Sequence, residues 1–147
     1  MKILAIASGG GHVVELLRLQ PAFDGHELVY MSTHESFAGS FKGYEYHTIP
    51  DFSRWNSFRM PFIATKVLRA LRQIKPDVIV TTGAAPGVLV LFLGRLLGAK
   101  TIWVESLCHA ERVSISGKMC MRFADRVYTQ WPHLANRKII YSGNIMK

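Results

Sequence analysis

The chain has 147 residues, 49% of them hydrophobic, and 18 basic against 10 acidic residues give it a formal net charge of +8. These values fit one globular domain with a single core, and they exclude a disordered chain or two full domains. The two cysteines match no metal-ligand spacing, so we predict reduced thiols, no metal site and no cofactor.

Short apolar runs alternate with helical patterns along the chain. We predict strands at residues 2–7, 27–31, 44–49, 78–80, 101–104, 126–128 and 138–141, and helices at 13–19, 61–75, 88–97 and near 118–123. This alternation indicates a single α/β domain over residues 1–147, with a Rossmann-like, doubly wound parallel sheet of five to seven strands. Ligands of such sheets bind beyond the carboxyl ends of the strands, so the residues that follow each strand are the site candidates.

A glycine turn follows the first predicted strand. Ser8, Gly9, Gly10 and Gly11 lead directly into a helix that begins near His12. Glycines allow a tight turn and a close approach of the backbone to a ligand, and the free N–H groups of a helix start suit phosphate. The third glycine of the dinucleotide-binding pattern is missing, and a turn that serves packing alone is the alternative.

The first turn of this helix carries two groups that could move a proton. His12 lies there, and Glu15 lies three residues on, on the same helix face. Because a helix N-terminus lowers the pKa of a histidine, we expect a neutral His12 that can accept or donate a proton. The alternative is capping, in which Glu15 closes the turn and His12 bonds a carbonyl.

The helix predicted at residues 61–75 is basic and amphipathic, and aromatic and arginine residues precede it. Such helices can lie on anionic membrane surfaces, although core-packing helices with a solvated face show the same pattern. No apolar stretch reaches the about 20 residues that a membrane-spanning helix needs. We predict a membrane contact formed by Trp55, Phe58, Arg59, Phe62, Lys66, Arg69 and Arg72.

Three further segments follow the fourth and fifth predicted strands. Residues 81–87 form a second small-residue turn at a helix start, which could be a ligand-facing wall or tight packing. Glu105 and Ser106 end the fifth strand, where a carboxylate suits an orienting or hydroxyl-binding role, with a surface salt bridge as the alternative. Residues 114–118 contain Gly-Lys but form no P-loop, because Arg112 stands where that motif needs glycine.

Five segments in this order resemble a known enzyme family: Gly-Gly-His-x-x-Glu at 10–15, and residues 82–87, 105–106, 114–118 and 130–132. Their spacing is similar to that of the membrane-anchor subunit of the two-part UDP-N-acetylglucosamine transferase that extends dolichyl-diphosphate-GlcNAc. Its bacterial relatives in capsule and exopolysaccharide synthesis are the most similar. The resemblance implies the N-terminal half of a GT-B glycosyltransferase, whose UDP-sugar is bound by a separate sister subunit.

The resemblance also implies partners and roles. The partners are the sister subunit, a polyprenyl-diphosphate-linked saccharide as acceptor, and an anionic membrane surface. His12 would lie near the reacting hydroxyl, as general base or only as a positioning group, and Glu105 would have an orienting role. The residues expected to hold the acceptor diphosphate are Ser8, Gly9, Gly10, Gly11, Glu15, Gly83, Ala84, Pro86, Gly87, Ser106, Ser114, Ser116, Gly117 and Lys118.

The eukaryotic subunits of this family carry an N-terminal membrane-spanning helix, and this sequence shows none. We therefore expect a cytoplasmic protein, held peripherally at the inner face of the membrane by its basic amphipathic surface. Because 147 residues accommodate only one of the two halves of a GT-B enzyme, we expect no transferase activity from the chain alone.

Two other functions are weaker candidates. A stand-alone Rossmann nucleotide-binding module would need an acidic residue just after the second strand, and the nearest one is Glu35. A nucleic-acid-binding protein would fit the net charge, but the chain has no recognisable reading motif, so we predict no nucleic-acid partner.

Overall fold

One parallel sheet forms the centre of the protein. The structure, a computed structural model, describes residues 1–52 and 58–146. Its strands pair in the order β3-β2-β1-β4-β5-β6-β7, and every neighbouring pair is parallel. The strands are β1 (Lys2–Ala7), β2 (Glu27–Ser32), β3 (Glu45–Thr48), β4 (Val78–Thr81), β5 (Lys100–Val104), β6 (Arg126–Thr129) and β7 (Ile140–Tyr141).

The strand order reverses between β1 and β4 at the centre of the sheet. This arrangement confirms the predicted doubly wound, Rossmann-like topology, with seven strands at the upper end of the expected range. The reversal separates the loops that follow β1 and β4, and this separation opens a crevice at the carboxyl edge of the sheet.

Helices connect the strands, and short 3₁₀ segments supplement them. The α-helices are α1 (Gly11–Leu19), α2 (Met60–Ile74), α3 (Ala84–Leu96) and α4 (Ile115–Cys120), and the 3₁₀ helices include η1 (Gln20–Phe23), η2 (Glu35–Phe41) and η4 (Pro132–Leu134). The expected starts of α3 at residue 88 and of α4 near residue 118 were wrong by four and three residues. The Ser114 hydroxyl caps α4 by accepting the Gly117 N–H at 2.9 Å, and so fixes an earlier start.

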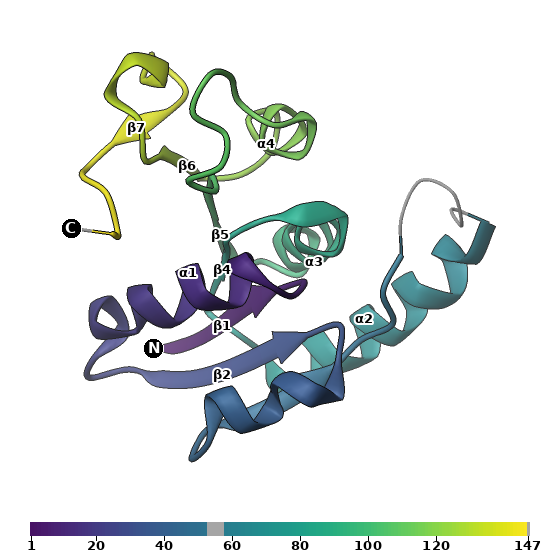
Figure 1. Ribbon diagram of the computed structural model, residues 1–147. Coiled ribbons are helices and arrows are strands. Elements are labelled where there is room, and N and C mark those ends of the chain that lie inside the picture. The colour runs from purple at the N-terminus through teal and green to yellow at the C-terminus, as the bar shows by residue number, and fades with distance from the viewer. Residues whose placement is uncertain (53–57, 147) are drawn as a thin grey trace.

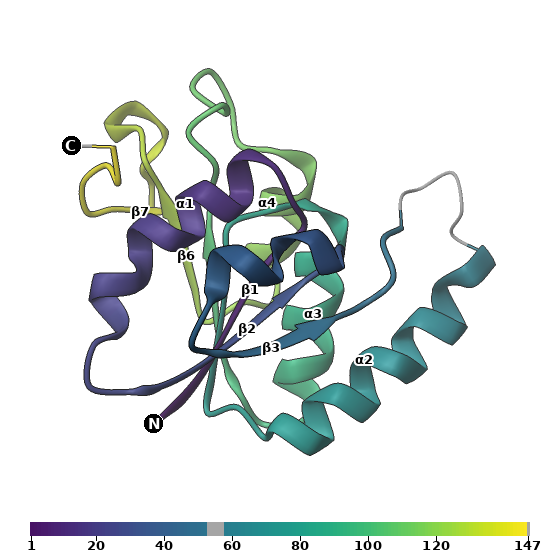
Figure 2. The same ribbon diagram turned by 60° about the horizontal axis from the view of Figure 1, so that its bottom comes forward.

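Alternate residues of the strands enter two separate cores, one on each face of the sheet. Leu4 and Ile6 of β1 face the core that α2, α3 and α4 cover. Ile3 and Ala5 face the core that α1 and the 3₁₀ segments cover (Figures 1 and 2). Coverage on both faces explains why β1 is a continuous apolar run rather than an alternating one.

Candidate functional site

A cleft of about 1330 Å³ lies beyond the carboxyl ends of β1, β4 and β5. The first residues of α1, α3 and α4 border it, because each of these helices follows one of these strands directly or through a loop. The predicted residues that the structure brings together in its wall are Ser8, Gly9, Gly10, His12, Gly83, Ala84, Pro86, Glu105, Ser106, Ser114, Ser116 and Lys118.

Four of the expected acceptor contacts are not in the described part of the cleft wall: Gly11, Glu15, Gly87 and Gly117. Gly87 and Gly117 are packing positions, because a Cβ there would collide with the side chains of Thr81 and Glu105 respectively. Glu15 is buried at 6% exposure and hydrogen-bonded inside the protein. Glu15, Gly87 and Gly117 therefore lie behind the wall, whereas Gly11 is exposed. Contact of Gly11 with an acceptor stays a prediction.

Several cleft residues were not predicted. They come from the segments after β2 and β3, from the junction of β4 and α3, from β5 and the loop that follows it, and from α4. All of these segments lie near carboxyl ends of strands, where ligands of such sheets bind. That rule is the signal that could have found them. These residues are His34, Phe37, Asp51, Phe52, Thr82, Ala85, Trp103, His109, Arg112, Val113, Ile115 and Met119.

Two glycines allow the turns that open α1 and α3. Gly10 precedes α1 with φ 55°, and Gly83 precedes α3 with φ 150°, both in the region that favours glycine. Ala84 also has a positive φ of 67°, which costs a residue with a side chain some strain. No side chain caps either of these two helices, so their first N–H groups face the cleft end of the molecule.

The imidazole of His12 lies between α3 and Glu15. A Cβ at Gly83 would lie 2.5 Å from His12 Cε1, so only glycine leaves room for the ring. The Thr82 hydroxyl donates to the His12 carbonyl at 2.7 Å, which joins α1 to the end of β4. His12 Nδ1 lies 3.7 Å from Glu15 Oε2, and the side chain is 25% exposed.

The pKa of His12 differs from the expectation. The Glu15 carboxylate raises the pKa of His12 above the ordinary value, because its attraction for the imidazolium outweighs burial, which lowers the pKa. A pKa lowered by the helix N-terminus was therefore the wrong prediction. Capping by Glu15 was also wrong, since this carboxylate accepts hydrogen bonds from Ser106 and Leu107, which are distant in sequence.

Glu105 is a buried residue that is hydrogen-bonded inside the protein. Its side chain is 1% exposed, which rules out the surface salt bridge. The carboxylate accepts from Trp103 Nε1 at 2.8 Å and from the Ser114 N–H at 3.2 Å. The Gln130 amide donates to the Glu105 carbonyl at 3.1 Å. Glu105 thus ties the end of β5 to the start of α4 and to the segment after β6.

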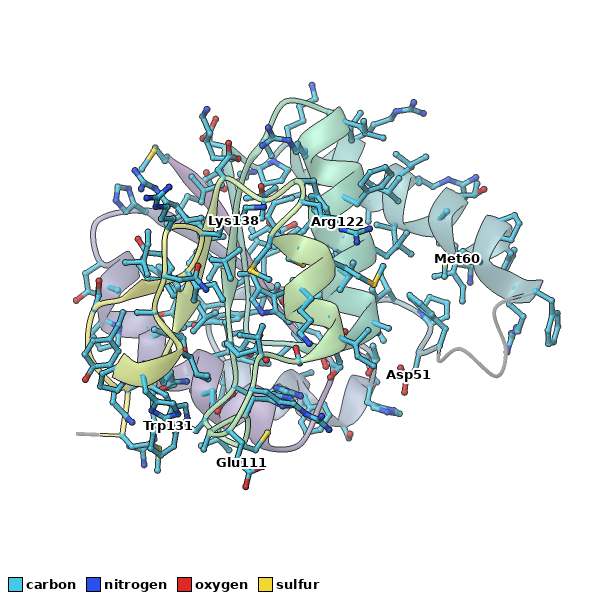
Figure 3. The ribbon with its side chains drawn as sticks, turned by 90° about the horizontal axis from the view of Figure 1, so that it is seen from above. Asp51, Met60, Glu111, Arg122, Trp131 and Lys138 are labelled. Atoms are coloured by element: carbon cyan, nitrogen blue, oxygen red, sulfur yellow. The ribbon has the colours of Figure 1, made fainter. Side chains whose placement is uncertain are left out.

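The basic helix has the expected two faces. Ile63, Val67, Leu71 and Ile74 of α2 are buried in the core. The predicted membrane-contact residues Phe58, Arg59, Phe62, Lys66, Arg69 and Arg72 are exposed. Trp55 lies outside the described residues. In Figure 3, α4, α3 and α2 lie in a row, and Met60 at the start of α2 is at the outer end of the molecule.

Within the part of the chain that the structure describes, no helix is long and apolar enough to span a bilayer.

The nearest candidate for a ribose-binding carboxylate, Glu35, accepts the Thr48 hydroxyl at 2.5 Å and so bonds to β3. This contact weakens the alternative of a stand-alone nucleotide-binding module.

Sequence comparison places the chain among oligosaccharide biosynthesis proteins. The model of the family described as "Oligosaccharide biosynthesis protein Alg14 like" matches residues 52–145, more than half of the chain. The human UDP-N-acetylglucosamine transferase subunit ALG14 is 29% identical over 99% of this chain and 83% of its own length. A second relative is the UDP-N-acetylglucosamine--N-acetylmuramyl-(pentapeptide) pyrophosphoryl-undecaprenol N-acetylglucosamine transferase of Oenococcus oeni, 26% identical over 98% of this chain and 43% of its own length.

Solved structures share the fold. MurG of Acinetobacter baumannii superposes with a TM-score of 0.79 at 18% sequence identity, and UDP-N-acetylglucosamine 2-epimerase of Rickettsia bellii with 0.73 at 16%. The match covers 96% and 99% of this chain but only 45% of each of those chains. The chain therefore spans about half the length of these solved structures, and its fold is that of one half of a GT-B enzyme.

Proposed function

The chain belongs to the Alg14-like family of oligosaccharide biosynthesis proteins, and we propose that it is the non-donor-binding subunit of a two-part glycosyltransferase. In this proposal it holds a polyprenyl-diphosphate-linked saccharide, while a sister subunit binds the UDP-sugar. The observation that carries the proposal is the cleft, which joins helix N-termini, cations and His12 at the strand-order reversal of a GT-B-like half.

The chemistry of the cleft suits a diphosphate. The starts of α1 and α3 present the positive ends of helix dipoles, and no side chain caps either helix. At α1 the His12 and Val13 N–H groups already donate to the carbonyls of Gly9 and Gly10. Arg112 and Lys118 line the cleft from the loop after β5 and from α4, and both side chains are exposed. A diphosphate seated between them would be bound by charge-assisted hydrogen bonds, which are about twice as strong as neutral ones.

His12 provides the group for the chemical step. Transfer joins the acceptor hydroxyl oxygen to the anomeric carbon of the sugar and breaks the bond from that carbon to UDP, so the hydroxyl proton must leave. His12 accepts this proton as general base, and the nearby Glu15 carboxylate stabilises the imidazolium that forms. The alternative role, positioning of the diphosphate alone, predicts different kinetics for the His12→Ala variant.

The exposed face of α2 supplies the membrane contact in this proposal. Phe62, Lys66 and Arg69 share one exposed side of the helix, and Lys66 Nζ lies 4.8 Å from the centre of the Phe62 ring. An exposed aromatic ring beside cations suits the interface of an anionic bilayer. Contact through this face places the subunit peripherally on the membrane, where it recruits the sister subunit to the acceptor.

The names of the relatives direct the choice of donor. They state N-acetylglucosamine, so UDP-N-acetylglucosamine is the first sugar donor to assay. The capsule or exopolysaccharide pathway expected from the sequence stays a prediction.

Reconstitution tests the proposal. The purified chain, the proposed donor-binding sister subunit, and both together are incubated with labelled UDP-N-acetylglucosamine and a polyprenyl-diphosphate-linked GlcNAc acceptor. We expect transfer only from the pair, because the human relative is named as a subunit. Robust transfer by the isolated chain would refute the two-part enzyme.

A further inference from the structure

Two buried polar atoms face each other beside the cleft without making a hydrogen bond. Within the described residues, His12 Nδ1 and Glu15 Oε2 have no hydrogen-bond partner, and they are 3.7 Å apart. Buried polar atoms are almost always paired, and hydrogen bonds in unliganded sites are often long and close only in the bound complex. These two atoms are therefore each other's candidate partners.

The other oxygen of Glu15 is anchored. Glu15 Oε1 accepts the Ser106 hydroxyl at 3.0 Å and the Leu107 N–H at 2.8 Å. The Leu107 carbonyl in turn accepts Trp131 Nε1 at 2.9 Å, which ties this loop to the segment after β6. With Oε1 fixed in this way, Oε2 is the oxygen that is directed at His12.

The imidazole is held on its other side as well. Gly83 packs against the edge of the ring that includes Cε1 and Nδ1, and Thr82 bonds the backbone of His12. Nδ1 is fully buried, whereas the ring as a whole lines the cleft. Nε2 is therefore the nitrogen that remains available to a ligand.

We infer that Glu15 is a positioning residue for His12: its carboxylate, fixed by Ser106 and Leu107, accepts a hydrogen bond from Nδ1–H and leaves Nε2 free to accept a proton in the cleft. The reaction in which His12 takes part comes from the proposed function, on which the inference rests in this respect. The geometry of the pair of His12 and Glu15 is independent of that proposal. It replaces the expected contact of Glu15 with the acceptor, because a buried carboxylate behind the wall acts only through the histidine.

The other ionisable groups around the pair are few and already engaged. The Glu105 carboxylate adds a weaker attraction that raises the pKa of His12, but its oxygens are bonded to Trp103 and Ser114. His109 Nε2 lies 3.8 Å from Glu105, and Cys108 Sγ lies 3.1 Å from the Ser106 hydroxyl. Burial raises the pKa of Glu15, but His12, Leu107 and Ser106 outweigh it and lower that pKa, so the carboxylate is charged.

Nitrogen-15 NMR of the full chain tests the inference. The His12 signals are assigned by their loss in His12→Ala, and the tautomer is read above the pH at which the ring titrates. We expect wild-type His12 to carry its proton on Nδ1. In Glu15→Gln the amide NH₂ faces Nδ1, so the proton should move to Nε2 and the pKa of His12 should fall. Glu27→Gln, at the amino end of β2, is the matched control and should change neither.

The assembled complex gives the second readout. Glu15→Gln should lower kcat by about 10–100-fold, the range seen when a group that orients a functional side chain is removed, with KM for the acceptor little changed. An Nε2–H tautomer in the wild-type chain would overturn the inference even if the variant fails to fold. Unchanged His12 signals in a folded Glu15→Gln chain would overturn it too. Absence of transfer by the wild-type complex counts instead against the proposed function, and the NMR result still decides the role of Glu15.

Discussion

At the scale of single residues, His12 is the side chain on which the proposed chemistry depends. If it is the general base, His12→Ala should lower kcat of the assembled complex by about 10²–10⁴-fold. KM for the acceptor should change little, because the contribution arises in the transition state. Complex formation is checked first by size-exclusion chromatography. Normal turnover would end the catalytic role, and a raised KM with intact kcat would leave His12 as a positioning group.

The pH dependence of the reaction follows from the same residue. A general base accepts a proton only in its neutral form, and Glu15 raises the pKa of His12 above 6.5. The pKa is raised, so the protonated, inactive form persists to higher pH than for a free histidine. We expect kcat/KM to rise with pH through a value above 6.5 and then to level off. A profile without this rise, or with a rise centred below 6.5, would contradict the role of His12.

Glu105 should behave differently from His12, because its carboxylate orients protein groups and accepts two N–H donors. Glu105→Gln keeps the shape but offers an NH₂ group to buried donors, which leaves one of them unpaired. An unpaired buried donor costs about 1–3 kcal/mol of unfolding free energy. Denaturant unfolding should show this loss, and kcat should fall less than in His12→Ala. Equal losses of kcat with full stability would point to a direct role for Glu105 in the reaction.

The limits of prediction from sequence are clearest in these side chains. The glycine turns, His12 and Ser114 were recognised as site residues because they directly follow strands or begin helices. The spacing placed Glu15 beside His12 on one helix face, with capping as the alternative. The hydrogen bonds of Glu15 to Ser106 and Leu107 were missed because these residues lie 91 and 92 residues away in sequence, and only the folded chain shows this long-range contact.

At the scale of elements, α2 connects the fold to the membrane. Each cation near anionic lipid contributes about 1 kcal/mol to binding, and an exposed aromatic or aliphatic side chain contributes about 1.5–3 kcal/mol when buried. Replacing Lys66, Arg69 and Arg72 with glutamate should release the protein from anionic vesicles. The fold should survive, because these side chains are exposed while Ile63 and Val67 make the core contacts.

The matched control for this variant replaces Arg126, Arg137 and Lys138, which are also exposed, by glutamate and so changes the net charge equally. Figure 3 places Lys138 far from Met60 at the start of α2. Sedimentation with vesicles should fall for the α2 variant and stay higher for the control. If both variants sediment with the vesicles as the wild type does, α2 is excluded as the membrane contact. If both lose vesicle binding equally, the binding depends on the overall net charge of the protein and not on α2.

The elements themselves were predictable to different degrees. Apolar runs covered on both faces and bounded by turns made the strands evident, and the parallel topology followed from their alternation with helices. The start of α4 was misplaced because a single cap at Ser114 decides it. The segment η2 was not predicted, since a 3₁₀ stretch of Glu35–Phe41 has no clear helical period.

At the scale of the whole molecule, the proposed function assigns the acceptor and the UDP-sugar to two separate proteins. The cleft of this chain lies at the strand-order reversal and contains the cations Arg112 and Lys118. The acceptor is assigned to that cleft, and the UDP-sugar is assigned to the sister subunit. This division does not depend on which sugar is transferred or on how the chain reaches the membrane.

Titration calorimetry of the isolated chain tests this division most directly. One titration uses a water-soluble, short-chain polyprenyl-diphosphate-linked GlcNAc, and the other uses UDP-N-acetylglucosamine. We expect saturable binding of the acceptor, weakened about 10- to 100-fold by Arg112→Ala or Lys118→Ala, since a hydrogen bond to a charged group contributes about 1.5–3 kcal/mol. Arg126→Ala, on β6, should bind as the wild type does. Binding of UDP-N-acetylglucosamine in place of the acceptor, with the same dependence on Arg112 and Lys118, would contradict the account.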